Sequence, residues 1–275
     1  MKMRRIGSSP FAFPGFSGAT RQLVLANLLA YFALAIVGLA SAGTANAIGR
    51  LFVFAPFPFL HGALWQPLTY SFVHPGALIL NTLFELLSLW FLAGFLENFH
   101  SANWVLWLYA ASVVGTAAAS LVIYALSASF GFALAPVPLY GCFGGIFGLL
   151  AAIGLLYGDT EFLLFFLIGI KARYLALIYA IVAIAMLFGQ QRMYAFAQLG
   201  GALAGLAFVR FAPRRGMGFA LSERWYGLRN RYYRWKRRRT ARKFEVYMRS
   251  QGRTVRFDGQ GRVIHEDHDD KSRWN

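Results

Sequence analysis

Six long stretches of apolar residues follow one another along the chain, separated by more polar segments. A helix that spans a membrane needs about 20 consecutive, mostly apolar residues. Stretches of that kind cover residues 22–43, 77–96, 102–126, 142–158, 163–189 and 194–212. The fifth contains Lys171 and Arg173, so we expect its span to cover 172–189 and residues 162–170 to form an apolar connection at the membrane interface. The pattern therefore predicts six transmembrane helices.

The composition places these helices in a membrane and excludes an ordinary soluble domain. Hydrophobic residues make up 58% of the chain and charged residues only 14%, whereas soluble domains contain about 25% charged residues. We therefore predict an all-α fold, a polytopic bundle of six transmembrane helices. The expected organisation is a polar lead over residues 1–21, a membrane domain over 22–212 and a basic tail over 213–275.

Positive charge gathers at the two ends of the chain. The net charge is +16, and residues 214–275 contain 18 of the 27 Lys and Arg residues but only 7 of the 11 acidic ones. Lys2, Arg4 and Arg5 precede the first apolar stretch. Because basic segments beside membrane spans stay on the cytoplasmic side, we expect both termini to be cytoplasmic, in the plasma membrane of a prokaryotic cell.

The basic tail has the pattern of an amphipathic helix. Apolar residues recur at spacings of four, three, four and three: Leu221, Trp225, Leu228, Tyr232 and Trp235. Four consecutive basic residues follow: Lys236, Arg237, Arg238 and Arg239. Polybasic segments beside a membrane bind anionic lipid, so we expect these four residues to contact the bilayer. A protein partner is the alternative, and nucleic acid is the least favoured one. Residues 254–264 suggest a small hairpin.

Four ordered landmarks carry a family resemblance: three motifs, and the polar positions of the second apolar stretch that are described below. The segment Trp65-Gln66-Pro67-Leu68-Thr69-Tyr70-Ser71-Phe72-Val73-His74 precedes the second apolar stretch, Gly141-Cys142-Phe143-Gly144 begins the fourth, and Ala197-Gln198-Leu199-Gly200-Gly201 lies in the sixth. In this order, over residues 23–212, they resemble the rhomboid family of intramembrane serine proteases. The resemblance implies a serine nucleophile in the fourth helix and a histidine base in the sixth.

Both positions of that catalytic dyad are substituted. Phe143 stands where the family has its serine, and Gln198 stands where it has its histidine. Phenylalanine has no nucleophilic atom, and an amide is no general base near neutral pH. We therefore expect a catalytically inactive pseudoprotease that binds transmembrane segments of client proteins. The alternative is an active intramembrane endopeptidase that uses other residues.

Two polar residues of the second apolar stretch fall where the family places side chains that stabilise the oxyanion. Two alignments with the family are possible. In the first, Asn81 and Glu85 occupy the two positions; in the second, Ala77 occupies the first position and Asn81 the second. An ionised carboxylate at such a site repels a developing oxyanion. Glu85 is also an ionisable residue within a span, either a ligand or partner site or a hydrogen-bonded structural residue.

Few further residues are candidates for catalysis or metal binding. Cys142, the only cysteine, is a possible nucleophile with His74 as the nearest candidate base, but we expect it to fill a small-residue position. His61 and His74 are expected at the membrane interface. His265 and His268 lie in an acidic tail that we expect to be solvated, so we predict no metal site and no cofactor. Two glycine pairs at a spacing of four, suited to close helix packing in lipid, are Gly144 with Gly148 and Gly201 with Gly205.

Overall fold

The computed structural model describes residues 14–74, 79–131, 137–164, 168–189, 192–212 and 217–251. Contacts divide the chain into two units, of which the first ends at Ala212 and the second begins at Pro213. The elements of the first unit are α1 (Gly18–Ala40), α2 (Ala42–Phe52), α3 (Pro56–Leu60), α4 (Gln66–Thr69), the 3₁₀ helix η1 (Tyr70–Phe72), α5 (Ile79–Glu97), α6 (Ala102–Phe130), α7 (Phe143–Leu156), β1 (Glu161–Leu164), β2 (Ile168–Lys171), α8 (Ala172–Met186) and α9 (Arg192–Phe211).

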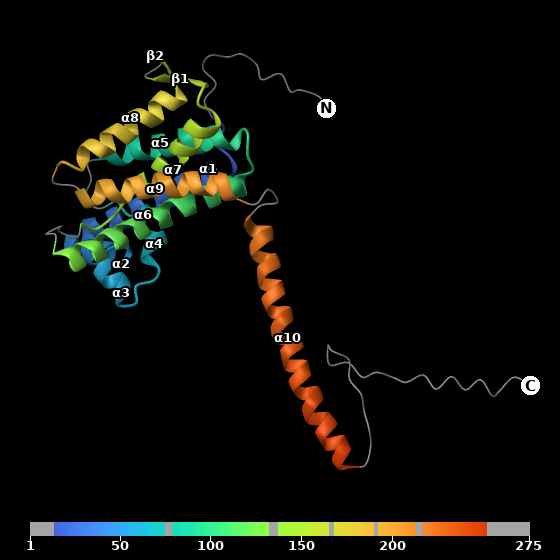
Figure 1. The fold of residues 1–275 in the computed structure, drawn as a ribbon. Coiled ribbons are helices and arrows are strands. Elements are labelled where there is room, and N and C mark those ends of the chain that lie inside the picture. Colours follow the sequence, from blue (N-terminus) through green and yellow to red (C-terminus); the bar gives the residue numbers. More distant parts are fainter. Residues whose placement is uncertain are drawn as a thin grey trace, which may run out of the picture. The chain divides into compact units, whose positions relative to one another are not determined.

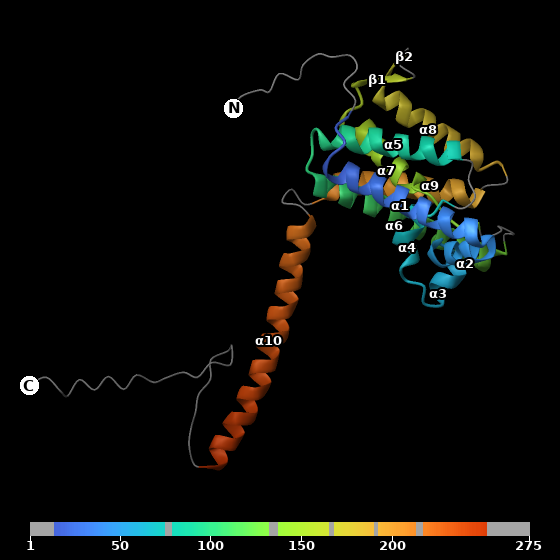
Figure 2. The same ribbon diagram turned by 180° about the vertical axis from the view of Figure 1, so that it is seen from behind.

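The core of the first unit lies where α6, α7 and α9 pack together. Figures 1 and 2 show α9 alongside α6, and α7 contacts both helices. Small residues line these contacts: a Cβ at Gly200 would meet the side chain of Ala119, and one at Gly115 would meet that of Ala204. Without large side chains between them, helix backbones in lipid approach closely and gain van der Waals contact.

A remote carboxylate holds the start of α1. Glu97, the last residue of α5, accepts hydrogen bonds from the backbone N–H of Ala19 at 2.6 Å and of Thr20 at 3.2 Å, and from the Thr20 hydroxyl at 2.6 Å. The first N–H groups of a helix have no partner within it, and a negative charge there also complements the helix dipole. The helix therefore begins at Gly18, inside the segment that we assigned to the polar lead.

The lengths of the apolar helices only partly match the prediction. Within the part of the chain that the structure describes, α1, α5, α6 and α9 are long and apolar enough to cross a membrane. The helices in the fourth and fifth predicted stretches, α7 and α8, are apolar but have only 14 and 15 residues. A high helical content and several spans thus follow from the structure, but the count of six does not.

The apolar connection before α8 differs from an all-α expectation, because part of it forms a hairpin. Strands β1 and β2 pair antiparallel, with Glu161 opposite Lys171 and Phe162 opposite Ile170. The opposite charges of the end pair and the strand propensity of isoleucine favour this pairing. Figures 1 and 2 place the hairpin on the opposite side of the bundle from the short helices α2–α4.

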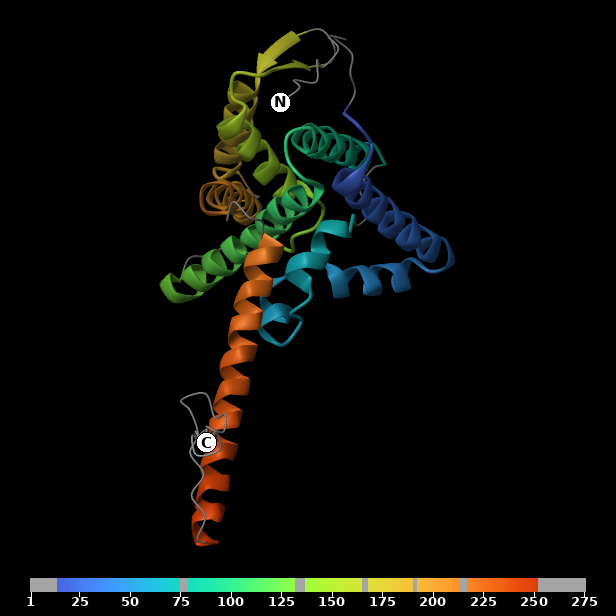
Figure 3. The ribbon, with the colours of Figure 1, turned by 90° about the vertical axis from the view of Figure 1, so that its right-hand side faces the viewer.

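The long connection between the first two apolar stretches is mostly helical. Three short helices, α2 to α4, and η1 follow one another there, as the side view in Figure 3 shows. Phe54 and Tyr70 are fully buried, whereas Phe57 and Trp65 expose more than half of their surface. An aromatic segment that is partly buried and partly exposed fits the expected position at the membrane interface.

The described part of the second unit is one helix, α10 (Met217–Ser250). It has 34 residues, and Trp225, Leu228, Tyr232 and Trp235 are all exposed on it. The hairpin suggested for residues 254–264 and the histidines at 265 and 268 lie outside the described residues.

Candidate functional site

A glycine turn positions the start of α7. Gly141 has a φ of 77°, a left-handed conformation that glycine adopts at little cost. Its N–H donates to the carbonyl oxygens of Tyr70 at 3.1 Å and Val73 at 2.9 Å. A Cβ at this position would lie 2.5 Å from Oε1 of Glu85. The turn therefore fastens the start of α7 to the segment around η1 and leaves room for a carboxylate.

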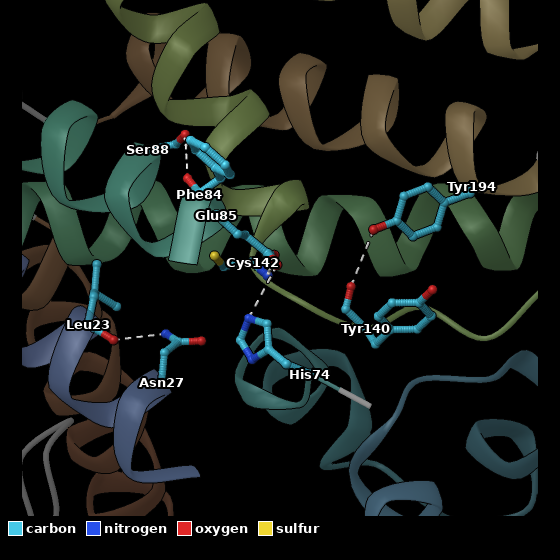
Figure 4. Close-up of polar contacts among 9 residues, drawn as sticks. All are labelled: Leu23, Asn27, His74, Phe84, Glu85, Ser88, Tyr140, Cys142 and Tyr194. Atoms are coloured by element: carbon cyan, nitrogen blue, oxygen red, sulfur yellow. Dashed lines mark hydrogen bonds and ion pairs between the residues drawn. The ribbon is translucent and has the colours of Figure 1, made fainter. Parts of the chain in front are cut away.

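Three side chains with different donor atoms meet beside this turn (Figure 4). The backbone N–H of Cys142 donates to Oε1 of Glu85. Nε2 of His74 lies 3.3 Å from Oε2 of the same carboxylate. The imidazole, carboxylate and thiol donor atoms of His74, Glu85 and Cys142 all lie within 4.8 Å of one another. They come from three separate segments: the residues after η1, the helix α5 and the residue before α7.

This cluster is shielded from solvent. The side chains of His74 and Glu85 are only 2% and 6% exposed, and Cys142 is fully buried. Neither ring nitrogen of His74 has a hydrogen-bond partner among the described residues. The 3.3 Å contact is thus an electrostatic proximity without hydrogen-bond geometry. An ionised carboxylate in such a place needs compensation, which the N–H at the start of α7 and the imidazole provide.

The two positions at which we expected the catalytic dyad lie in helices that pack against each other. Phe143 is the first residue of α7, and Gln198 is buried within α9. Neither side chain can attack a peptide bond or remove a proton from a nucleophile near neutral pH. The two catalytic functions of a serine protease therefore have no residue to carry them at these positions.

The two glycine pairs lie at the contact between these same helices. A Cβ at Gly201 would lie 2.8 Å from the carbonyl oxygen of Gly144, and one at Gly205 would lie 2.7 Å from Cα of Gly148. Both distances are to backbone atoms, which cannot rotate away. This contact fixes the separation of α7 and α9.

The two polar residues expected in the oxyanion region differ in their surroundings. Asn81 lies in the first turn of α5 and is exposed. Glu85, one turn later, is buried and bound to Cys142. Of the two, only Glu85 is placed at the start of α7.

The arrangement is unfavourable for a cysteine nucleophile. Contacts join Glu85 to both Cys142 and His74, but no hydrogen bond joins Cys142 directly to His74 among the described residues. A nucleophilic thiol needs a base beside it and a thiolate form. A neighbouring carboxylate opposes the loss of the thiol proton, because it repels the thiolate.

His74, which we expected at the membrane interface, is buried inside the first unit. The turn at Gly141 covers this residue, since it docks α7 onto the backbone of Tyr70 and Val73. His61, by contrast, is exposed, and its Nδ1 lies 2.8 Å from the carbonyl oxygen of Phe57. In the sequence, His74 stands out because it ends the motif that begins at Trp65. Its burial was not predictable from that motif, because it depends on the turn at Gly141, which is remote in sequence.

A cavity of about 730 Å³ reaches the cluster from one side. Its lining includes His74, Val73 and Tyr140 near the cluster, and Leu34 and Arg50 from α1 and α2. One wall of the cavity is thus part of the buried site.

The four consecutive basic residues of the tail are exposed on α10: Lys236, Arg237, Arg238 and Arg239. The Arg239 guanidinium lies 5.5 Å from the ring centre of Trp235, and that of Arg229 lies 4.7 Å from Tyr226. Cation–π contacts of this kind hold the charged and the aromatic group of each pair together.

Comparison with known protein families matches residues 61–215 to the rhomboid domain. Comparison with curated proteins gives no match. The matched segment covers more than half of the 275 residues and contains all three motifs, the turn at Gly141 and the buried cluster. With its apolar helices, the chain is an integral, multi-pass membrane protein. It belongs to the rhomboid family.

Proposed function

We propose that this chain is a catalytically inactive rhomboid-family protein that binds transmembrane segments of other membrane proteins. In this proposal α7 and α8 also cross the bilayer, which gives six spans and cytoplasmic termini. The observation that carries the proposal is the contact between the carboxylate of Glu85 and the backbone N–H of Cys142, beside the substituted dyad position Phe143.

This contact removes the electrostatic part of catalysis. The start of a helix presents backbone N–H groups and the positive end of its dipole, which together stabilise an oxyanion. Here the chain's own carboxylate accepts the hydrogen bond of Cys142. An incoming oxyanion would have to displace it and would be repelled by its charge. The loss thus extends beyond Phe143 and Gln198.

The scaffold that a client segment would contact is retained. Many large apolar side chains on α5 and α8 are exposed, including Leu83, Phe84, Leu177 and Ile181. The 730 Å³ cavity provides a recess between α1, α2 and the segment before α7. Such surfaces suit van der Waals packing with another helix in lipid, which needs no catalytic group.

The first test is cleavage of a model single-span rhomboid substrate by the purified chain in liposomes, with an active rhomboid as the positive control. We expect no cleavage by the natural chain. A Phe143→Ser/Gln198→His variant should remain inactive while Glu85 holds the N–H of Cys142. Adding Glu85→Asn should raise its activity. Cleavage by the natural chain would refute the proposal and favour the endopeptidase alternative.

The second test measures client binding directly. A photo-crosslinking amino acid at Tyr140, which lines the cavity, should capture the model transmembrane segment. The same probe at Leu203, an exposed residue of α9, is the matched control. Equal capture at both positions would show nonspecific contact in the bilayer and would contradict the binding proposal.

For the tail, we propose that α10 binds anionic lipid. Each basic residue near an anionic surface contributes about 1 kcal/mol, and Lys236, Arg237, Arg238 and Arg239 are all exposed. Amide hydrogen exchange of α10 should be slower in nanodiscs of anionic lipid than in zwitterionic ones. Replacing the four residues with glutamine should abolish the difference; its persistence would argue for a protein partner or another contact.

A further inference from the structure

We propose that His74, Glu85 and Cys142 form a binding site for a zinc-class transition-metal ion in the interior of the bundle. We expected no metal site from the sequence, in which Cys142 lies far from the other two residues. The turn at Gly141 brings them together, so that their three donor atoms lie within 4.8 Å of one another.

The donor set fits such an ion. Imidazole nitrogen, carboxylate oxygen and thiolate sulfur are the three ligand types of protein zinc sites, and sites with three protein ligands keep a fourth position for water or another ligand. Tetrahedral bonds of the usual lengths place the ligand atoms about 3.4–3.7 Å apart. Nε2 of His74 and Oε2 of Glu85 are already 3.3 Å apart, so only a modest inward shift of the third donor is required.

An unpartnered group points to the same site independently. The imidazole of His74 is 98% buried and aimed at the cluster, yet neither ring nitrogen has a hydrogen-bond partner among the described residues. Leaving a buried polar group without a partner is destabilising. A metal bond to Nε2 would satisfy that nitrogen. Oε1 of Glu85 is meanwhile held by the N–H of Cys142, which orients the carboxylate as supporting hydrogen bonds do in metal sites.

Charge balance favours the bound state. Burying a carboxylate within a membrane bundle is costly. A divalent ion with one carboxylate, one thiolate and one neutral imidazole gives a group with no net charge. Binding releases the thiol proton to solvent, because only the thiolate is a ligand. His74 lines the 730 Å³ cavity, which provides an access route for the ion and for water.

The single cysteine of the chain makes the test specific. Co²⁺ serves as the probe, since a thiolate ligand gives it an intense charge-transfer absorption, and only Cys142 can supply a thiolate. The full chain, purified in detergent with a non-thiol reductant, should bind one Co²⁺ with this absorption and release it to Zn²⁺. Cys142→Ser should abolish the band. His74→Gln and Glu85→Gln should each weaken binding at least tenfold.

The controls separate this site from other histidines. His61→Gln alters the exposed histidine of the same connection and should leave binding unchanged. A His265→Ala/His268→Ala variant should keep the thiolate band while losing any binding by the tail. If a cluster variant fails to fold, X-ray absorption of the Zn²⁺-loaded natural chain decides, with one sulfur ligand expected. Absence of the band and of a sulfur ligand in the folded natural chain would overturn the proposal, as would a band unaffected by both His74→Gln and Glu85→Gln.

Discussion

The contact between α7 and α9 allows a prediction with a worked magnitude: Gly205→Ala should destabilise the bundle. A Cβ at Gly205 would lie 2.7 Å from Cα and 2.8 Å from the carbonyl oxygen of Gly148. Comfortable carbon–carbon contact begins at about 3.5 Å, so the methyl group is about 0.8 Å too close. Both neighbours are backbone atoms of a helix, so the two helices themselves must separate.

The expected cost follows from two opposing effects. Overpacking costs about 1–3 kcal/mol, and the absence of a side chain that can move favours the upper end, about 3 kcal/mol. Alanine gains about 1 kcal/mol over glycine within a helix. The net loss in the free energy of unfolding should therefore be about 2 kcal/mol.

The matched control is Gly49→Ala in α2. There a Cβ would have no atom within 4 Å, so only the helix gain of up to about 1 kcal/mol remains. Reversible unfolding in mixed micelles, followed by circular dichroism, measures both variants. A Gly205→Ala protein as stable as the natural chain, or as Gly49→Ala, would refute the contact and the reasoning built on it.

Three further predictions concern single polar residues. Glu85→Gln keeps an acceptor for the N–H of Cys142 and should change the free energy of unfolding by less than about 1 kcal/mol. Glu85→Leu removes this acceptor and should lower the free energy of unfolding by about 2–3 kcal/mol. Equal losses for the two variants, measured by unfolding in micelles, would contradict this prediction. Glu97→Gln should cost about 1–2 kcal/mol and increase amide exchange at Ala19, because the charged acceptor at the start of α1 is lost; unchanged exchange would argue against this cap. Burial lowers the pKa of His100, so the unfolded chain takes up its proton first, and stability should fall as the pH drops through about 6.5. His100→Gln should reduce that fall, and identical pH curves for the two proteins would contradict the prediction.

The sequence was informative about the helices because lipid imposes a local rule. Backbone groups within a bilayer must be paired inside their own segment, so each apolar stretch had to contain a helix. Its exact start was not predictable in the same way. The first helix begins at Gly18 because Glu97 accepts its first N–H groups, and that partner is 78 residues from Ala19. A contact between residues so far apart cannot be predicted from the local pattern of apolar and polar residues.

The hairpin and the buried histidine were missed for related reasons. The segment over residues 162–170 is apolar without a clear alternation, so its strands are defined by pairing with each other, as in Glu161 opposite Lys171. His74 looked interfacial because its neighbours in sequence are aromatic and close to the membrane surface. Its burial depends on the turn at Gly141, whose partner carbonyls belong to Tyr70 and Val73. Motif order, by contrast, did identify the family.

Glu85 links the proposed loss of catalysis to the buried cluster. A carboxylate at the N-terminus of α7 uses the hydrogen-bond donor that an oxyanion would need, and the same carboxylate needs positive charge nearby because it lies inside the bundle. Among the described residues, His74 is the basic side chain in ion-pair contact with it. The carboxylate of Glu85 therefore takes part in both proposals: it occupies the hydrogen-bond donor at the start of α7, and it supplies one of the three donor groups of the proposed metal site.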